Sequence, residues 1–241
     1  MIFAAGLGTR LKPITDTIPK ALVPVGGKTL LEHVILKLAN QGFDELIVNV
    51  HHHADKIIDF LKEQNNFGLR IEISDERDLL LDTGGGIRKA SHFFNDGEPF
   101  LIHNVDILSD ANLSELYNLH KSSGNDATLL VKERETSRYL YFNEERRLKG
   151  WMNTKTGEMK SPFADFQPEK EHRFAFSGIH VLSPAIFEHM KDYPAKFPIM
   201  DFYIENAAKA KIGYHLNNNL RMIDVGKLDS LKEAEEHFKQ F

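Results

Sequence analysis

The residues of this sequence best suited to chemistry are glycines and charged side chains that directly follow short apolar segments. The apolar stretch Ile2–Ala5 leads into Gly6 and Gly8, and the cations Arg10 and Lys12 follow. Two closely spaced glycines let the backbone fold back so that its N–H groups point at an anion. The spacing therefore indicates a phosphate-binding loop, although an ordinary tight turn could also use two glycines.

Two common phosphate loops do not fit this segment. A dinucleotide-binding loop has the pattern GxGxxG, and Leu11 occupies its third glycine position. A Walker A loop has the pattern GxxxxGK[ST]; 27–29 supply its end, but Leu22 stands where its first glycine belongs. We interpret 27–29 as a turn ahead of a helix.

Two acids lie at the ends of apolar strands. Asp106 follows the stretch 100–105, and Asp224 follows 221–223. Carboxylate oxygens are ligands that Mg²⁺ prefers, usually together with substrate phosphates. The pair therefore predicts a Mg²⁺ site, whereas a single Asp in this position is often a helix N-cap. Asp224 could cap a helix that begins near Lys227.

A second glycine-rich segment, 81–87, follows a predicted strand. Its three glycines leave room for a flat ring against the backbone, and the alternative is a helix start capped by Asp82 or Thr83. The run His51–His53 does not predict a metal site, because successive residues of an extended chain point to opposite faces.

The elements that must position these residues alternate between strands and helices. A helix is expected over 29–40, with Thr29 as N-cap and Glu32 completing a capping box. The other expected elements up to residue 132 are strands at 2–5, 45–50, 69–74, 100–105 and 127–132, and helices at 54–62, after Gly86 and at 113–120. This order predicts an α/β, Rossmann-like, mostly parallel or mixed sheet with helices on both faces, which binds ligands at the carboxyl ends of its strands.

The second half of the chain departs from this alternation. From about 138 to 172 it is polar and rich in turns, and we expect a small antiparallel insert that covers the site from one side. Regular structure resumes with a strand at 174–182, helices after Pro184 and Pro198, strands at 211–216 and 220–223 that close the sheet, and a helix at 228–238. The whole chain, 1–241, is therefore expected to be one domain with an insert.

Composition limits the partners. The formal net charge of −5 argues against nucleic-acid binding by a broad basic face. The absence of cysteine excludes a disulfide scaffold and thiolate metal sites. No apolar run is long enough to cross a membrane, and no secretory signal is visible. We expect a cytoplasmic protein without a membrane partner; the sequence leaves open whether it forms a homo-oligomer.

The longer motif around the first loop is specific. It reads Gly6-x-Gly8-Thr9-Arg10-Leu11-x-Pro13-x-Thr15, followed by Pro19-Lys20 and Pro24. This pattern closely resembles the signature of the sugar-1-phosphate nucleotidyltransferases, or NDP-sugar pyrophosphorylases. The resemblance implies the nucleotide-diphospho-sugar transferase fold and an enzyme that joins an NTP to a sugar-1-phosphate, with release of pyrophosphate.

The resemblance also implies roles for individual residues. Arg10 and Lys20 would be catalytic and neutralise the departing phosphates, and Asp106 and Asp224 would hold Mg²⁺. The nucleotide would be bound by residues of both glycine-rich segments: Ala5, Gly6, Gly8, Thr9, Asp82, Thr83 and Gly84. The sugar phosphate would be bound by Gly85, Lys149 and Gly178.

The Thr83–Gly86 segment most resembles the N-acetylmuramate-1-phosphate uridylyltransferases, which favours UTP and a product used in cell-wall synthesis. The mannose-1-phosphate guanylyltransferases, which use GTP, share much of the framework. Two departures are notable: Asn104-Val105-Asp106 replaces the frequent Asn-Gly-Asp, and the insert has no Glu-Lys-Pro motif, so Lys149 is the candidate ligand of the sugar phosphate.

Two other classes are considered. Glycosyltransferases on a related fold typically use an Asp-x-Asp motif, and the triplet ending at Asp106 begins with Asn104. A non-catalytic regulatory homologue that binds nucleotide sugars would usually have lost the arginine, the lysine or the acids, all of which this chain keeps.

Overall fold

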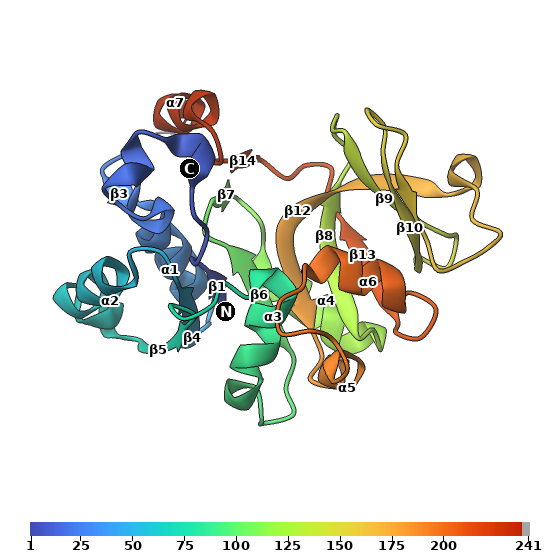
Figure 1. The fold of residues 1–241 in the computed structure, drawn as a ribbon, viewed down its shortest axis with the longest axis horizontal. Coiled ribbons are helices and arrows are strands. Elements are labelled where there is room, and N and C mark those ends of the chain that lie inside the picture. Colours follow the sequence, from blue (N-terminus) through green and yellow to red (C-terminus); the bar gives the residue numbers. More distant parts are fainter. Residues whose placement is uncertain (238–241) are drawn as a thin grey trace. The chain divides into compact units, whose positions relative to one another are not determined.

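The structure is a computed structural model that describes residues 1–237. The chain divides into two compact units (Figure 1). The first contains 1–80, 102–114 and the C-terminal segment from 220; the second contains 81–101 and 115–219.

The first unit is built on parallel strands. The strands run in the order β6-β1-β4-β5, with bounds β1 (Ile2–Phe3), β4 (Glu45–Val50), β5 (Arg70–Asp75) and β6 (Phe100–Asn104), of which 102–104 belong to this unit. Each neighbouring pair is parallel, and Phe3 lies opposite both Asn49 and Asn104. The parallel sheet predicted for the first half of the chain is confirmed, and the carboxyl ends of these strands lie at one edge.

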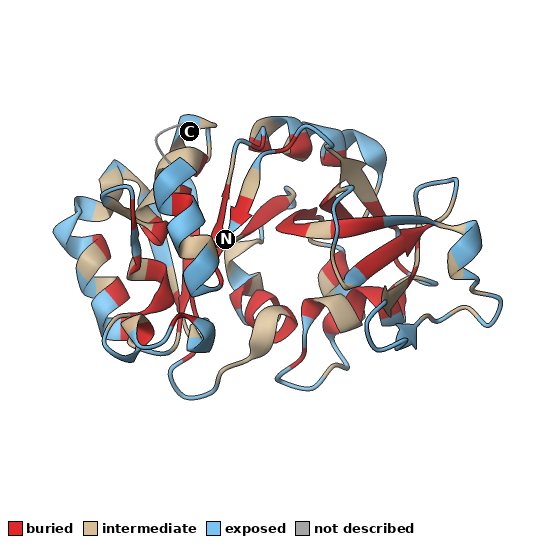
Figure 2. Ribbon diagram, turned by 90° about the horizontal axis from the view of Figure 1, so that it is seen from above, coloured by how far each residue is buried: buried red, intermediate tan, exposed pale blue. Residues whose placement is uncertain are grey.

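Helices α1 (Leu30–Asn40), α2 (Ala54–Glu63) and α7 (Leu228–His237) belong to the same unit. The predicted start of α1 is confirmed: the Thr29 side chain accepts a hydrogen bond of 3.1 Å from the N–H of Glu32. The apolar face of α1 is fully buried and consists of Leu30, Leu31, Val34, Ile35 and Leu38. Figure 2 colours the buried residues of the protein red. Residue 238, expected as the end of the last helix, lies outside the described residues.

Two small antiparallel sheets complete the first unit. One pairs β2 (Pro24–Val25) with β3 (Lys28–Thr29), and the other pairs β7 (Ile107–Ser109) with β14 (Met222–Asp224). The prediction that 220–223 closes the main sheet is wrong. The segment pairs instead with β7, a short strand that begins directly after Asp106.

The second unit has a mostly antiparallel sheet in the order β11-β10-β9-β12-β8-β13. The bounds are β8 (Ala127–Lys132), β9 (Arg138–Phe142), β10 (Leu148–Asn153), β11 (Met159–Lys160), β12 (His172–Leu182) and β13 (Ile212–Leu216). Only the β13–β8 pair is parallel among these described pairs. The antiparallel character predicted for 138–172 is confirmed.

The helices of the second unit are α3 (Asp82–Lys89), most of α4 (Leu113–Ser123), α5 (Ile186–Met190) and α6 (Ile199–Asn206). Helix α3 begins before the glycines, so the prediction of a helix that starts after Gly86 is wrong. Across 1–237, no helix is both long and apolar enough to cross a membrane.

Candidate active site

The loop after β1 is shaped by Gly8. This residue has φ of +65°, and an added Cβ would lie 2.8 Å from Cγ2 of Thr15, so a side chain does not fit. The hydroxyl of Thr15 donates to the Gly8 carbonyl oxygen over 2.8 Å, and the N–H of Leu11 donates to the same oxygen over 2.8 Å. The loop therefore turns into a short 3₁₀ helix, η1 (Thr9–Leu11), with Gly6, Thr9 and Arg10 exposed.

The next two turns carry the chain to Lys20. These are η2 (Ile14–Asp16) and η3 (Lys20–Leu22). Lys20 is largely buried and forms a close ion pair with Asp106 Oδ2; the two side chains are 11% and 18% exposed. The structure thus brings together a cation and an acid that the sequence analysis singled out independently.

Asp106 and Asp224 lie on adjoining segments. The N–H of Val225 donates to the carbonyl oxygen of Asp106 over 2.8 Å, and Asp224 lies opposite Ile107 in the β7–β14 pair. The two-stranded sheet therefore holds the two acids next to each other, although they are far apart in the sequence.

Arg10 joins this group at Gly226. A Cβ at Gly226 would lie 2.7 Å from Asp224 Oδ1 and 2.9 Å from Arg10 Nη2. Both side-chain ends therefore converge on the α-carbon of Gly226. The Lys20–Asp106 pair and the ends of Arg10 and Asp224 lie on segments that the Val225–Asp106 hydrogen bond joins, and we call these four residues the charged cluster.

The charged cluster fits a Mg²⁺ ion that is shared with a substrate. Its acids are Asp106, in the turn before β7, and Asp224, at the end of the paired strand β14. Mg²⁺ usually takes one or two protein carboxylates and completes its shell with water and phosphate oxygens. No group of three or more His, Cys, Asp or Glu residues among 1–237 could hold a metal by itself. His51 Nδ1 instead lies 2.7 Å from the carbonyl oxygen of Glu76, and His53, with φ of 54°, directly precedes α2.

The second glycine-rich segment lies in the second unit and packs against its own chain. A Cβ at Gly84 would lie 2.3 Å from the Phe197 ring, and one at Gly85 would lie 2.3 Å from the carbonyl oxygen of Ala195. The N–H groups of Gly84 and Gly85 donate to the Phe197 carbonyl oxygen over 2.9 and 3.2 Å. These glycines are therefore needed for close packing between α3 and 195–197.

Asp82 and Thr83 fix the start of α3. Asp82 has a positive φ of 61°, and its Oδ1 accepts from the N–H of Thr83 over 2.7 Å. The hydroxyl of Thr83 accepts from the N–H of Ile199 over 2.8 Å. Neither side chain serves as the N-cap, which is Leu81.

The two remaining candidates for the sugar phosphate lie on strands of the second unit. The ammonium of Lys149, on β10, lies 3.5 Å from the centre of the Phe163 ring and makes no ion pair with a described residue. Gly178 has φ of +75° and lies where the β12–β8 register shifts, between Phe176 and His180. A cation over a ring and a glycine-dependent bulge are both compatible with a ligand site.

Sequence reasoning missed Asn49 and Glu76. Asn49 Oδ1 accepts from the N–H groups of Ala4 and Ala5, over 2.7 and 3.2 Å, and its Nδ2 donates to Glu76 Oε1 over 2.8 Å. Asn49 and Glu76 are 2% and 1% exposed. An amide inside the otherwise apolar stretch 46–50 was the signal that could have identified Asn49, because buried polar groups are normally hydrogen-bonded.

Comparison with known families identifies the class. The model of the nucleotidyl transferase family matches residues 1–240. The chain therefore belongs to the nucleotidyl transferase family.

Individual relatives agree on the class and differ in substrate. The chain is 44% identical over 108 residues to an N-acetylmuramate alpha-1-phosphate uridylyltransferase of Caulobacter vibrioides, over 44% of each chain. It is 35% identical over 142 residues to a mannose-1-phosphate guanyltransferase of Gibberella zeae, over 58% of this chain and 39% of that protein. The matched region thus spans less than half the length of either relative.

Solved structures share the fold. HddC from Yersinia pseudotuberculosis superposes with a TM-score of 0.76 and 25% identity, over 98% of this chain and 97% of that one. The mixed sheet with helices predicted from the sequence is confirmed by this agreement and by the strand order.

Proposed function

We propose that this protein transfers a nucleotidyl group from an NTP to a sugar-1-phosphate and releases pyrophosphate. The observation that carries the proposal is the charged cluster, in which Lys20 pairs with Asp106 while Arg10 and Asp224 meet at Gly226. Family membership and the named activities of the relatives support the same reaction.

The first loop is proposed to hold the NTP. Gly6 and Thr9 are exposed there, and Gly8 turns the backbone so that N–H groups can face phosphate oxygens. Arg10 and Lys20 add the positive charge that a protein with a net charge of −5 must gather locally. Ala5 begins the loop, and Asp82, Thr83 and Gly84 are proposed to contact the nucleoside.

The reaction is an in-line displacement at the α-phosphorus. A phosphate oxygen of the sugar-1-phosphate forms the new P–O bond as the bond to the β-phosphate breaks, and pyrophosphate leaves with that electron pair. This nucleophile is already ionised at neutral pH, so no general base is needed. Catalysis then consists of positioning and charge neutralisation, with Arg10 and Lys20 stabilising the departing pyrophosphate.

Asp106 and Asp224 are the residues that would hold Mg²⁺. A bound Mg²⁺ supplies neutralising charge to phosphate oxygens. In the protein alone, Lys20 provides the counter-charge to Asp106.

On the sugar side, we propose Lys149, Gly178 and Gly85. Lys149 would supply the cation for the sugar phosphate, because its ammonium lies over the Phe163 ring and is not paired with an acid among the described residues. UTP and N-acetylmuramate-1-phosphate are the favoured substrates, from the Thr83–Gly86 segment and from the uridylyltransferase relative. GTP and mannose-1-phosphate are the alternative, from the guanyltransferase relative.

Product analysis across a substrate grid tests this proposal. Purified protein with Mg²⁺ is incubated with UTP, GTP, CTP, ATP or dTTP and with the 1-phosphates of N-acetylmuramate, mannose, glucose or N-acetylglucosamine. Mass spectrometry of an NDP-sugar in one combination identifies both substrates. NTP binding without any NDP-sugar, together with a co-purified nucleotide sugar, would indicate a regulatory homologue instead.

A further inference from the structure

Hydrogen bonds connect the ends of three neighbouring strands of the first unit, β1, β4 and β5, at the edge of the sheet where the NTP loop begins. Asn49, near the end of β4, accepts the N–H groups of Ala4 and Ala5, which directly follow β1. Its amide nitrogen donates to Glu76, which directly follows β5. One buried amide therefore links the first residues of the loop to a buried carboxylate two strands away.

The main chain at Glu76 is itself held in place. Its N–H donates to the carbonyl oxygen of Val50 over 2.7 Å, and its carbonyl oxygen lies 2.7 Å from His51 Nδ1. Residues at and directly after the end of β4 thus form hydrogen bonds with the side chain, the N–H and the carbonyl oxygen of Glu76.

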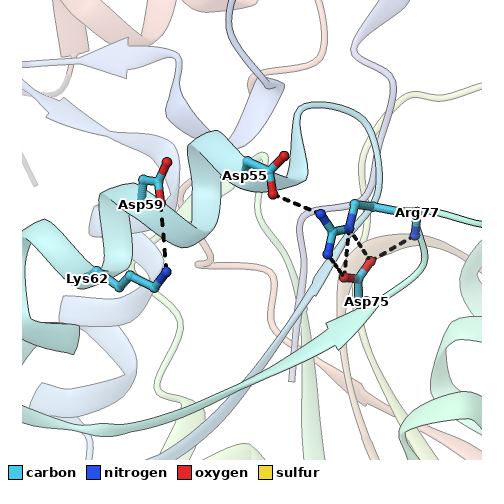
Figure 3. A network of polar contacts seen from close by, with 5 residues as sticks. All are labelled: Asp55, Asp59, Lys62, Asp75 and Arg77. Atoms are coloured by element: carbon cyan, nitrogen blue, oxygen red, sulfur yellow. Dashed lines mark hydrogen bonds and ion pairs between the residues drawn. The ribbon is translucent and has the colours of Figure 1, made fainter.

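The neighbouring Arg77 adds a second support (Figure 3). Its guanidinium pairs with Asp75 at the end of β5 and with Asp55 on α2, over 2.7 and 2.8 Å. The side chains of Arg77, Asp75 and Asp55 are 50%, 37% and 78% exposed, and such exposed pairs contribute little singly. Together with the contacts of Val50 and His51, they limit the freedom of the turn that carries Glu76.

We propose that Glu76 is a positioning residue that acts through Asn49 to fix the start of the NTP phosphate loop. The inference rests on the proposed function, because the loop matters only if it binds an NTP. Asn49 can accept from Ala4 and Ala5 in only one orientation of its amide. Glu76, a pure acceptor when ionised, selects that orientation by taking the NH₂ group.

A polarity swap tests the proposal. Asn49→Asp keeps the acceptor for Ala4 and Ala5 but places two buried carboxylates face to face, so the loop start is displaced. Glu76→Gln supplies a new donor, so in the double variant the amide at position 76 donates to the carboxylate at position 49, and only this bond is reversed. We expect Asn49→Asp to raise the KM for the NTP about tenfold, as expected for loss of a buried hydrogen bond. The double variant should return to within about threefold of wild type.

Two readouts separate positioning from general destabilisation. The KM for the sugar-1-phosphate should stay unchanged in every variant, and the affinity for inorganic tripolyphosphate, measured by calorimetry, should follow the KM for the NTP. Ser74→Ala is the matched control on β5, because the Ser74 hydroxyl is buried without a partner among the described residues. Ile57→Val, in the buried face of α2, controls for a small loss of stability.

Hydrogen exchange of the peptide 1–11 in the ligand-free protein tests the relay without any activity. Faster exchange in Asn49→Asp and recovery in the double variant are expected even if the grid of substrates gives no product. Wild-type exchange and tripolyphosphate affinity in Asn49→Asp would overturn the proposal. If Asn49→Asp altered only the preference among NTPs with different bases and left tripolyphosphate binding unchanged, the proposal would also be overturned. Glu76 would then be assigned to recognition of the nucleobase.

Discussion

Lys20 and Asp106 are 86 positions apart in the sequence and form an ion pair whose side chains are only 11% and 18% exposed. Such a pair is costly to break from one side, because the remaining charge loses its partner in a poorly hydrated place. The pairing links η3, which follows the first loop, to the acid after β6, and the proposed neutralisation of phosphate charge depends on it.

Neutral substitutions of Lys20 and of Asp106 should have different effects on activity and on stability. Asp106→Asn and Lys20→Met are each expected to lower kcat by at least about 10²-fold, since Asp106 would hold Mg²⁺ and Lys20 would neutralise the departing phosphates. Lys20→Met should also lower the free energy of unfolding by about 1–3 kcal/mol, because Asp106 is left unpaired. Urea denaturation and steady-state kinetics measure the two effects.

The double variant Lys20→Met with Asp106→Asn provides the control for this pair. It should regain much of the stability lost in Lys20→Met but none of the activity. Lys12→Met, which removes an exposed pair with Asp16, should change stability little. Wild-type turnover of Asp106→Asn in Mg²⁺ would refute the metal assignment.

Gly226→Ala is expected to reduce activity without unfolding the protein. Its methyl group would meet the ends of two flexible side chains, Asp224 Oδ1 at 2.7 Å and Arg10 Nη2 at 2.9 Å. Both ends can move aside, so the thermal midpoint should change little, while kcat should fall about tenfold as the charged cluster is displaced. Calorimetry and initial rates test this; a large fall in the midpoint with normal kcat would assign Gly226 to folding alone.

Gly84→Ala should instead lower the stability of the protein. Its methyl group would lie 2.3 Å from the Phe197 ring and 2.9 Å from the Phe197 carbonyl oxygen. Overpacking of this kind costs about 1–3 kcal/mol of unfolding free energy. Phe197→Leu in the same chain should recover part of the loss in denaturation experiments, because it frees space beside α3. No loss of stability in Gly84→Ala would contradict the packing role.

His180 should make the protein sensitive to acid. Burial lowers the pKa of His180 from 6.5 to about 3, and neither ring nitrogen has a partner among the described residues. Since the folded-state pKa is the lower one, the unfolded chain binds more protons between these values. The stabilising contribution is complete above about pH 6.5 and decreases as the pH falls, by up to about 1.4 kcal/mol per pH unit.

The variant His180→Leu tests this pH dependence. It should flatten the decline of unfolding free energy between pH 6.5 and 4.5 in urea titrations. His103 and His120, whose pKa values are lowered to about 4 by burial, should leave a remaining slope of the same sign. An unchanged slope in His180→Leu would show that His180 does not titrate on unfolding.

The sequence predicted those parts of the fold that depend on local pattern. The cap of α1 at Thr29, its apolar face and the buried strand 45–50 all follow from periodicity and short-range hydrogen bonding. Helix α3 begins earlier than predicted. Glycines are poor helix formers, and here close packing against Phe197 outweighs their low helix propensity.

Long-range pairing explains the other differences. The strand at 222–224 pairs with 107–109, and nothing in either short segment reveals its partner. The acids of the charged cluster were predicted from their positions after strands and the cations from the loop motif, whereas the approach of Arg10 and Asp224 to Gly226 required the structure. Asn49 and Glu76 act through contacts between strands, which a single sequence does not display.

The most direct test of the proposed nucleotidyl transfer is release of pyrophosphate that depends on the sugar-1-phosphate. Purified protein is given an NTP and Mg²⁺, and phosphorus NMR follows pyrophosphate before and after a sugar-1-phosphate is added. We expect no release before the addition, and then equal amounts of pyrophosphate and NDP-sugar in wild type but not in Lys20→Met. Release without the sugar phosphate, or an NDP-sugar formed equally well by Lys20→Met, would contradict it.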